Sequence, residues 1–374
     1  MEKEKKDIAA PKGEVKLMKG NEAVAIAAIR YGCDGYFGYP ITPQSEVLET
    51  LEALMPWETT GMVVLQAESE VAAINMVYGG AATGKAVMTS SSSPGISLKQ
   101  EGISYIAASQ LPAWILNVMR GGPGLGTIQP SQADYFQATK GGGHGDYHLI
   151  VLAPSSVQEM VDFVALGFDL SFKYLTPAMI LADGIVGQMM EKVVLPPQRP
   201  RRTDEEVKAQ CPWAANGRTG MRKRNVVTSL EMDPSLMEIN NHKLQATYHE
   251  IEKNEQRWEE KGLEDADYLI VAFGSVARIC EKACELAKEK GIKAGILRPV
   301  TLWPFPKKAI EEAAIGKKGI LVVELNAGQM IEDVRLAVHD SLPVEHFGRL
   351  GGIIPSPGEI VDALEEKIIN RSER

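Results

Sequence analysis

The sequence predicts an α/β protein with two parallel-sheet domains, and three observations lead to this prediction. From about residue 20 to residue 195, short apolar runs typical of buried strands alternate with runs of helical spacing. The same alternation returns at about residue 268, after a segment of different character. A chain of 374 residues also exceeds what one hydrophobic core usually supports, so two domains are expected.

The first domain reads as a series in which most strands are followed by a helix. The expected elements are a helix at 21–31, a strand at 35–39, a helix from Pro43, a strand at 62–65, a helix at 71–84, a strand at 86–89, a helix from Pro94, strands at 113–118 and 148–152, a helix at 156–172 and a strand at 178–181. Thr42 is the expected N-cap of the helix at Pro43, because its hydroxyl can accept a backbone N–H and proline suits the first turn. This order is typical of a mostly parallel sheet flanked by helices.

A linker and a second strand–helix series complete the chain. Residues 196–202 (PPQRPRR) open the linker, and an exposed, charged helix is expected at 241–262. Strands are then expected at 268–273, 293–297 and 319–324, with a helix at 276–290 after the first of them. The predicted boundaries are 1–195 for the first domain, 196–264 for a linker or insertion, and 265–374 for the second domain.

The basic residues of the linker permit two interpretations. They are Arg218, Arg222, Lys223 and Arg224. Such a cluster can contact a phosphate, but more often it is a solvated loop or a subunit contact.

Composition and charge exclude several classes of function. The net charge of −9 argues against nucleic acid as the main partner. The first seven residues are charged and lack an apolar core, so we expect no signal peptide there. No apolar stretch approaches the length of a membrane span. We therefore expect a soluble, cytoplasmic protein that does not bind membranes.

Neither the cysteines nor the histidines form a convincing metal site. The chain has four cysteines, too few and too scattered for a disulfide framework or an iron–sulfur cluster. Cys280 and Cys284 would share one helix face, which favours buried thiols over a metal pair. His144 and His148, with Asp146 between them, suggest a metal, but the surrounding glycines give no helical geometry and no third ligand is near. We predict no metal site in this chain.

Three polar side chains are expected to converge where strands end. Glu70 lies between the strand at 62–65 and an Ala/Gly-rich helix, while Thr42 and Arg120 lie in loops after other strands. Ligands of open α/β sheets bind at the carboxyl ends of the strands. An acid, a hydroxyl and a guanidinium there suggest chemistry on a small anionic substrate.

Each of these residues also has a plainer interpretation. Glu70 can be a surface acid that the helix dipole favours in the first turn, and Arg120 can pair with a local acid. The serines at 90–93 either edge the same site or form a polar turn before Pro94.

The ordered set of motifs resembles the pyrimidine-binding domain of thiamine diphosphate enzymes, and more closely the α-type subunit of the 2-oxoacid:ferredoxin oxidoreductases. In the first domain the resemblance is carried by YPITP at 39–43, Glu70, SSSSPG at 90–95, RGGP at 120–123 and HG at 144–145. In the second domain it is carried by GS at 274–275, RP at 298–299, PFP at 304–306, ELN at 324–326 and GQ at 328–329, which are similar to a transketolase C-terminal domain. Among subfamilies, QAESE at 66–70 and GGGHGDY at 141–147 look most like the branched-chain (3-methyl-2-oxobutanoate, or 2-ketoisovalerate) enzymes.

The resemblance implies a role for each site residue. The matching glutamate of the family hydrogen-bonds N1′ of the cofactor's aminopyrimidine, so Glu70 would activate the cofactor. Arg120 would bind the substrate carboxylate, a task suited to a planar fork of donors. Thr42 would orient the substrate, and Pro40 and Ile41 would line the pyrimidine pocket together with Thr42 and Glu70.

A missing motif implies partner subunits. Thiamine diphosphate enzymes hold the diphosphate through Mg²⁺ with a Gly-Asp-Gly segment followed by Asn, and this chain has no such arrangement. By resemblance, a β-type subunit would bring the diphosphate site, Mg²⁺ and a [4Fe-4S] cluster, and γ and ferredoxin-like δ subunits would complete the complex.

The resemblance implies the CoA-dependent oxidative decarboxylation of a 2-oxoacid with reduction of ferredoxin. The branched-chain acid is the expected substrate. The alternatives are a 2-oxoglutarate or pyruvate enzyme and a non-catalytic assembly subunit.

Overall fold

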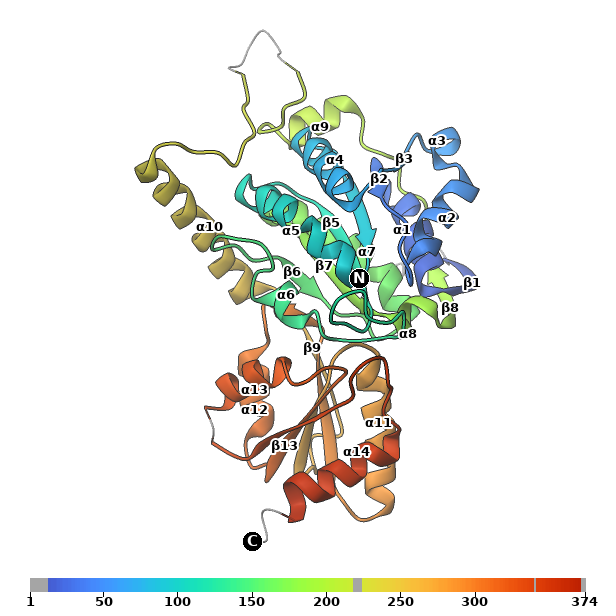
Figure 1. Ribbon diagram of the computed structural model, residues 1–374, viewed down its shortest axis with the longest axis vertical. Helices are drawn as coiled ribbons and strands as arrows, with labels where there is room; N and C mark the ends of the chain where they lie inside the picture. Colours follow the sequence, from blue (N-terminus) through green and yellow to red (C-terminus); the bar gives the residue numbers. More distant parts are fainter. Residues whose placement is uncertain (1–12, 218–223, 340, 371–374) are drawn as a thin grey trace, which may run out of the picture.

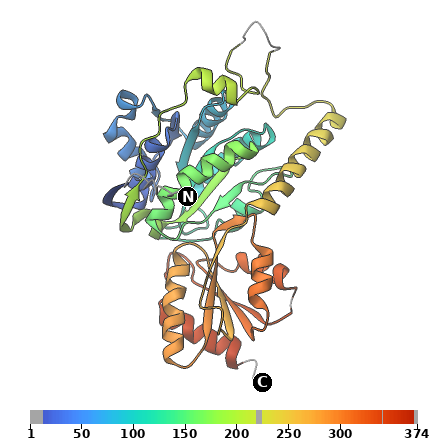
Figure 2. The same cartoon turned by 180° about the vertical axis from the view of Figure 1, so that it is seen from behind.

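The α/β class is confirmed by a computed structural model, which describes residues 13–217, 224–339 and 341–370. This part of the chain contains a seven-stranded sheet, a five-stranded sheet and a two-stranded ribbon. In Figure 1 the seven-stranded sheet and its helices, blue to green, lie above the five-stranded sheet and its helices, orange to red. Figure 2 shows the same two layered bodies from behind.

The seven-stranded sheet is parallel except at one edge. Its strands are β2 (Gly35–Gly38), β3 (Val63–Gln66), β4 (Val87–Ser91), β5 (Trp114–Met119), β6 (Ile150–Leu152), β7 (Ala178–Asp183) and β12 (Thr301–Trp303). Their spatial order is β12-β6-β7-β5-β4-β2-β3. The central strands β4, β5 and β7 are buried along their whole length, which explains why they read as continuous apolar runs in the sequence. Since β2, β3, β4 and β5 are parallel, their carboxyl ends meet at one edge, hereafter the carboxyl edge.

Helices cover both faces of this sheet. They are α1 (Gly20–Tyr31), α2 (Ser45–Leu54), α3 (Pro56–Thr59), α4 (Glu70–Ala82), α5 (Ser93–Ala108), α6 (Tyr135–Thr139), α7 (Val157–Tyr174) and α8 (Gly184–Gln188). Helices α4 and α5 pack on the face that carries Ile115, whereas α1, α2 and α7 pack on the face that carries Trp114. A ribbon of β1 (Glu14–Lys19) and β8 (Met190–Leu195) lies beside α1.

The five-stranded sheet forms the core of the second domain. Its strands are β9 (Trp258–Lys261), β10 (Tyr268–Val271), β11 (Ala294–Pro299), β13 (Gly319–Glu324) and β14 (Val344–Gly348), in the order β14-β13-β10-β11-β9 with only β9 antiparallel. Its helices are α11 (Gly274–Glu289), α12 (Lys307–Ala314), α13 (Met330–Val338) and α14 (Pro357–Leu364), which a π-helix (Glu365–Ile369) extends. Helices α11 and α14 pack together, and so do α12 and α13.

The connecting segment forms α9 (Asp204–Gln210) and α10 (Pro234–Asn254), and α10 runs along the outside of the first domain (Figure 1). The prediction of a helix at 241–262 is wrong in its second half, because residues 258–261 form β9. Glu255 explains the end of α10, since its buried carboxylate accepts hydrogen bonds from Lys173 at 2.7 Å and Tyr174 at 2.6 Å. Of the basic cluster in this segment, Arg218, Arg222 and Lys223 lie outside the described residues, and Arg224 is exposed.

A strand of the second domain completes the sheet of the first. The chain leaves β11 at Pro299, and after Val300 it forms β12, which pairs antiparallel with β6. Beside this crossing the Arg298 guanidinium binds both oxygens of Glu159, at 2.6 and 3.0 Å, and so ties β11 to α7. The domain boundaries at residues 195 and 264 stay predictions.

Two smaller features concern the thiols and the helices. Cys280 and Cys284 lie on α11, the first buried and the second half-buried, and burial raises the pKa of both thiols. Among the described residues, no helix combines the length and the apolar character needed to cross a membrane.

Candidate active site

Glu70 is the first residue of α4, directly beyond the carboxyl edge. The Ser69 hydroxyl caps this helix by accepting the backbone N–H of Ala72 at 3.2 Å, and the Glu70 side chain turns inward, with 7% of the residue exposed. In the part of the chain that the structure describes, no hydrogen bond or salt bridge reaches its carboxylate. A Cβ atom on Gly95 of α5 would lie 2.7 Å from Glu70 Oε1, so glycine is required for this close approach.

Arg120, which follows β5, is brought against Thr42. It is buried, with 8% exposed, and its Nη1 donates to the Thr42 carbonyl at 2.9 Å while Nη2 donates to the Leu125 carbonyl at 3.0 Å. Its Nε is buried without a partner among the described residues. Its backbone N–H donates to the Ser93 hydroxyl at 3.0 Å, which fixes the start of the loop. The guanidinium is therefore positioned by carbonyls rather than by a local acid, and Nε keeps one free donor.

The prediction that Thr42 caps a helix is wrong. Helix α2 begins at Ser45, and the N–H of Gln44 donates to the Ile41 carbonyl at 3.0 Å, which closes a separate turn before the helix. Thr42 is exposed within this turn, while Pro40 and Ile41 are half-buried in the loop after β2. The turn places the Thr42 carbonyl rather than its hydroxyl in a structural hydrogen bond, that with Arg120.

A buried chain of hydrogen bonds anchors this loop to β4. The Ser90 hydroxyl donates to Gln44 Oε1 at 2.5 Å and lies 2.7 Å from the Tyr36 hydroxyl. Gln44 Nε2 in turn donates to the Tyr39 carbonyl at 3.3 Å. The position of the loop thus depends on the serine segment that precedes α5.

Two of the four serine hydroxyls at 90–93 form hydrogen bonds, and the other two have no partner among the described residues. Ser90 and Ser93 are hydrogen-bonded, and Ser93 donates to Asp134 at 2.6 Å, whose own pKa is raised by burial of the carboxyl. The hydroxyls of Ser91 and Ser92 are buried without a partner among the described residues, as is Asn117 Oδ1 on the neighbouring strand. Buried polar groups nearly always have partners, so unpaired ones beside Glu70 and Arg120 point to a bound polar group.

Lys99 on α5 also faces this region, although none of the motifs in the sequence predicts it. The side chain is fully buried, and Nζ donates to Thr89 Oγ1 at 2.5 Å and to the Ser90 carbonyl at 3.2 Å. Burial lowers the pKa of Lys99 to about 7, and the negative charge of Glu70 acts in the opposite direction. A signal was present in the sequence, because Lys99 lies three residues after Ile96 and four before Ile103, on the buried stripe of α5.

The second domain buttresses the loop that follows Arg120. Gln132 Oε1 accepts the N–H of Leu325 at 3.1 Å, and Gln132 Nε2 donates to the Phe273 carbonyl at 2.9 Å. Asn326 Nδ2 donates to the Gln132 carbonyl at 2.8 Å, and a Cβ on Gly121 would lie 3.3 Å from the backbone of Gly351. The motif at 324–326 therefore serves the contact between the two domains.

The two histidines of the glycine-rich loop do not converge on a ligand site. His148 stacks on Trp303 with ring centroids 4.5 Å apart, while the exposed His144 packs edge-on against Tyr105 at 6.4 Å. No cluster of three or more His, Cys, Asp or Glu side chains suited to a metal is found in residues 13–217, 224–339 or 341–370.

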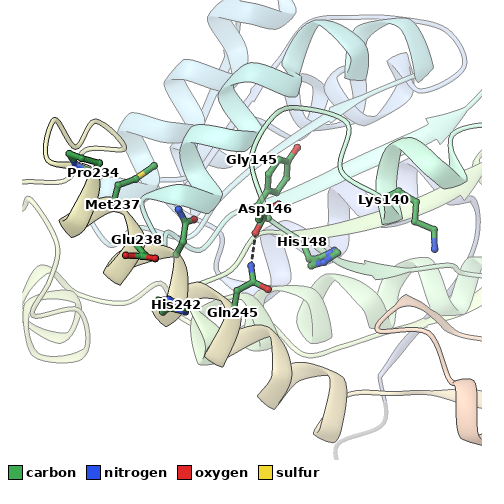
Figure 3. Close-up of a pocket in the computed structure, with 11 residues that line it drawn as sticks. Lys140, Gly145, Asp146, His148, Pro234, Met237, Glu238, His242 and Gln245 are labelled. Carbon is green, nitrogen blue, oxygen red and sulfur yellow. Dashed lines mark hydrogen bonds between the residues drawn. The ribbon is translucent and has the colours of Figure 1, made fainter.

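A cavity of about 670 Å³ lies between this loop and α10 (Figure 3). Gln245 of α10 spans it and donates to the Asp146 carbonyl at 2.8 Å. Neither Glu70, Thr42 nor Arg120 lines this cavity, so it is separate from the carboxyl edge.

Comparison with known sequences identifies relatives over nearly the whole chain. The family described as pyruvate flavodoxin/ferredoxin oxidoreductase, thiamine diphosphate-binding, matches residues 26–260, and pyruvate:ferredoxin oxidoreductase core domain II matches residues 266–360. The ketoisovalerate oxidoreductase subunit VorB of Methanothermobacter marburgensis is 48% identical, covering 94% of this chain and 97% of the relative. The 2-oxoglutarate synthase subunit KorA of Archaeoglobus fulgidus is 37% identical, with 95% and 100% covered.

Two solved structures share the arrangement. A 2-oxoglutarate:ferredoxin oxidoreductase from Magnetococcus marinus, with 2-oxoglutarate, coenzyme A and succinyl-CoA bound, matches at a TM-score of 0.81 and 28% identity, over 95% of this chain and 65% of that chain. This chain thus spans somewhat under two thirds of that neighbour. A split-gene transketolase, an inactive β4 tetramer, matches at 0.57 and 12% identity, over 94% and 97% of the two chains, which shows the fold alone.

Proposed function

The chain belongs to the pyruvate flavodoxin/ferredoxin oxidoreductase family, and from this premise we propose that it is the pyrimidine-side, α-type subunit of a thiamine diphosphate-dependent 2-oxoacid:ferredoxin oxidoreductase. The proposed reaction converts a 2-oxoacid, coenzyme A and oxidised ferredoxin to an acyl-CoA, CO₂ and reduced ferredoxin. We propose 3-methyl-2-oxobutanoate (ketoisovalerate) as the substrate, because identity is 48% to the ketoisovalerate subunit and 37% to the 2-oxoglutarate subunit.

The observation that carries the proposal is the Glu70 carboxylate, which is buried and has no hydrogen-bond partner among the described residues. The Ser91 and Ser92 hydroxyls and Asn117 Oδ1, unpaired among the described residues, lie in the same region, so it has hydrogen-bonding groups for a polar ring. Thiamine diphosphate, when bound, supplies the electron sink for decarboxylation. Glu70 would hold the hydrogen bond at N1′ of the pyrimidine, and Pro40 and Ile41 would contact the ring.

The substrate would be held by Arg120 and Thr42. The Arg120 guanidinium keeps Nε free while two carbonyls fix its orientation, which suits a planar donor awaiting a carboxylate. The exposed Thr42 side chain would orient the substrate beside it. These roles, like that of Glu70, are proposals that the substitutions below test.

The complete site requires partner subunits in this proposal. A β-type subunit would supply the diphosphate site with Mg²⁺ and a [4Fe-4S] cluster, and γ and ferredoxin-like δ subunits would join it, with ferredoxin as electron acceptor. Tight Mg²⁺-dependent binding of thiamine diphosphate by this chain alone would contradict the division. The cytoplasmic location stays a prediction.

Substitution of Glu70 tests the function. In the reconstituted complex, Glu70→Gln keeps the shape of the side chain but cannot exchange a proton, so we expect oxidation of the 2-oxoacid to fall by about 10²-fold or more. Gel filtration checks that the complex still assembles. Activity within a few-fold of the unsubstituted complex would instead identify a non-catalytic assembly subunit.

Substrate choice needs a separate assay. The purified complex is assayed with 3-methyl-2-oxobutanoate, 2-oxoglutarate and pyruvate at matched concentrations. We expect the highest kcat/KM for the branched-chain acid, and a preference for 2-oxoglutarate or pyruvate would refute that assignment.

A further inference from the structure

Gln132 is a buried residue of the first domain that forms four hydrogen bonds to the second domain. Its backbone N–H donates to the Leu325 carbonyl at 3.0 Å, and its Oε1 accepts the N–H of the same leucine at 3.1 Å. Its Nε2 donates to the Phe273 carbonyl at 2.9 Å, and its own carbonyl accepts from Asn326 Nδ2 at 2.8 Å. Because the residue is fully buried, the second domain rather than solvent fixes its position.

The segment that carries Gln132 also closes the loop that begins at Arg120. An isolated antiparallel bridge joins Arg120 to Pro130, and the N–H of Gly121 donates to the Gln129 carbonyl at 2.9 Å. Gln132 follows two residues beyond this bridge. The base of the loop is therefore attached to a segment that the second domain fixes.

The loop in turn holds the Arg120 guanidinium. Nη2 of Arg120 donates to the Leu125 carbonyl at 3.0 Å, although Leu125 itself is 81% exposed and its side chain adds little to the position of the loop. Four of the residues at 121–126 are glycines, which leave the backbone more conformational freedom than other residues do. The position of the Leu125 carbonyl therefore depends on how the base of the loop is held.

We propose that Gln132 is a positioning residue for Arg120, through which the second domain sets the orientation in which the guanidinium binds the carboxylate of the 2-oxoacid. The inference rests on the role proposed for Arg120. Arg120 Nε is buried without a partner among the described residues, and two carbonyls that bind Nη1 and Nη2 set its direction. A rotation of the guanidinium would misdirect this donor, because a hydrogen bond weakens steeply when its angle departs from linear.

A competing interpretation is that Gln132 only joins the two domains. Tyr135 of α6 allows the two interpretations to be compared, because it lies beyond the loop and is also fully buried. Its hydroxyl donates to Asp333 of α13 at 2.6 Å and so joins the same two domains. If domain contact alone matters, loss of either hydrogen-bonding side chain should have the same effect. If Gln132 positions Arg120, only its own loss should affect substrate binding.

Substitution of Gln132 in the reconstituted complex tests the proposal. Gln132→Met keeps the length of the side chain without its amide, and Tyr135→Phe is the matched control. Both are compared for kcat and KM with the 2-oxoacid that the unsubstituted complex turns over best, and for the dissociation constant of thiamine diphosphate, read from tryptophan fluorescence. We expect Gln132→Met to raise KM about tenfold and to change kcat and cofactor affinity by less than about twofold, because it displaces Arg120 and not Glu70. Tyr135→Phe should change each quantity by less than about twofold.

Hydrogen exchange provides a readout without turnover. In the full-length chain we expect faster deuterium uptake at 121–129 in Gln132→Met, and unchanged uptake there in Tyr135→Phe. If Gln132→Met does not assemble, Ser131→Ala removes a single hydrogen bond to the second domain, that from its hydroxyl to the Leu325 carbonyl at 3.3 Å. A smaller rise in KM is then expected.

Substitution of Arg120 separates this inference from the proposed function. Arg120→Met should raise KM by at least about tenfold, and in that background Gln132→Met should raise it little further, because the two residues act through one contact. Unchanged KM and unchanged exchange in Gln132→Met, or equal effects in Tyr135→Phe, would overturn the positioning role of Gln132. Unchanged KM in Arg120→Met would instead overturn the role proposed for Arg120.

Discussion

Replacing Lys99 by methionine should stabilise the full-length chain, and by an amount that depends on pH. Methionine keeps an unbranched side chain of similar length, so it can fill the same space in α5. Burial lowers the pKa of Lys99 from 10.5 to about 7, and each unit of displacement corresponds to about 1.36 kcal/mol. The charged lysine therefore costs the folded state about 4 to 5 kcal/mol below pH 7. Loss of the hydrogen bonds to Thr89 and to the Ser90 carbonyl costs the variant about 1 kcal/mol each, which leaves a net gain of about 2 to 3 kcal/mol.

The direction of the pH dependence follows from proton linkage. Above pH 10.5 the lysine is neutral in both states and the penalty is absent. As the pH falls from 10.5 to 7 the unfolded chain takes up the proton first, so the native protein loses stability until the folded pKa is passed. The advantage of Lys99→Met is thus greatest below pH 7, and it should shrink by about 2.5 kcal/mol between pH 7 and 9.

Urea unfolding of both proteins at pH 6, 7, 8 and 9, followed by far-UV circular dichroism, measures this difference. The other titrating groups are the same in both proteins, so their contributions to the pH dependence cancel in the difference between the two free energies of unfolding. Lys85→Met serves as the matched control, and its difference from the unsubstituted chain should not vary with pH. A difference for Lys99→Met that stays constant within about 0.5 kcal/mol from pH 6 to 9 would refute the reasoning, since it would mean that Lys99 titrates normally.

Two further substitutions test the packing around the site and between the domains. Gly95→Ala would place a methyl group against Ser91 and 2.7 Å from Glu70 Oε1, so we expect a lower melting temperature and weaker binding of thiamine diphosphate by the complex. Gly79→Ala, which meets no atom within 4 Å, is the control. Unchanged cofactor affinity in Gly95→Ala would contradict the close approach. Arg298→Met should lower the free energy of unfolding by about 3 kcal/mol, because it leaves Glu159 without its bidentate partner. Removal of the exposed pair of Lys282 and Glu285 should change it little, because solvent screens that pair. Urea unfolding distinguishes the two, and equal losses would refute the assignment.

Local sequence signals predicted the alternation of strands and helices well. The strand predicted at 62–65 forms at Val63–Gln66, and the helix predicted at 156–172 forms at Val157–Tyr174 after the Ser156 cap. These elements follow from apolar periodicity and caps, which depend only on near neighbours. The contact between Thr42 and Arg120 at one edge was also expected, because the carboxyl ends of parallel strands must meet. The roles of Glu70, Thr42 and Arg120 stay predictions.

Interactions between distant segments were not predictable in the same way. Thr42 preceded a proline and looked like a cap, but a turn closed by Gln44 and a hydrogen bond from Arg120, 78 residues away, determine its role. Strand β12 pairs with β6 across about 150 residues of sequence, which no local pattern encodes. Lys99 was missed for another reason: its place on the apolar stripe of α5 indicates burial, but only its hydrogen bonds to Thr89 and Ser90 of β4, both in another element, show what holds it there.

Strand β12 lies in the second half of the chain but pairs in the sheet of the first domain. This pairing limits how the protein can be divided into fragments. A fragment that stops at residue 264 would lose β12 and leave β6 at the margin of the sheet, with unpaired backbone groups open to other chains. Expressed alone, the remaining piece would carry residues 301–303 with no sheet to join. A polypeptide cut between its two layered bodies would therefore be prone to aggregate, whereas a fragment of the first body co-expressed with the second can recover the missing strand. The visible separation of the two domains in Figure 1 is therefore not a suitable site for dividing the chain into fragments.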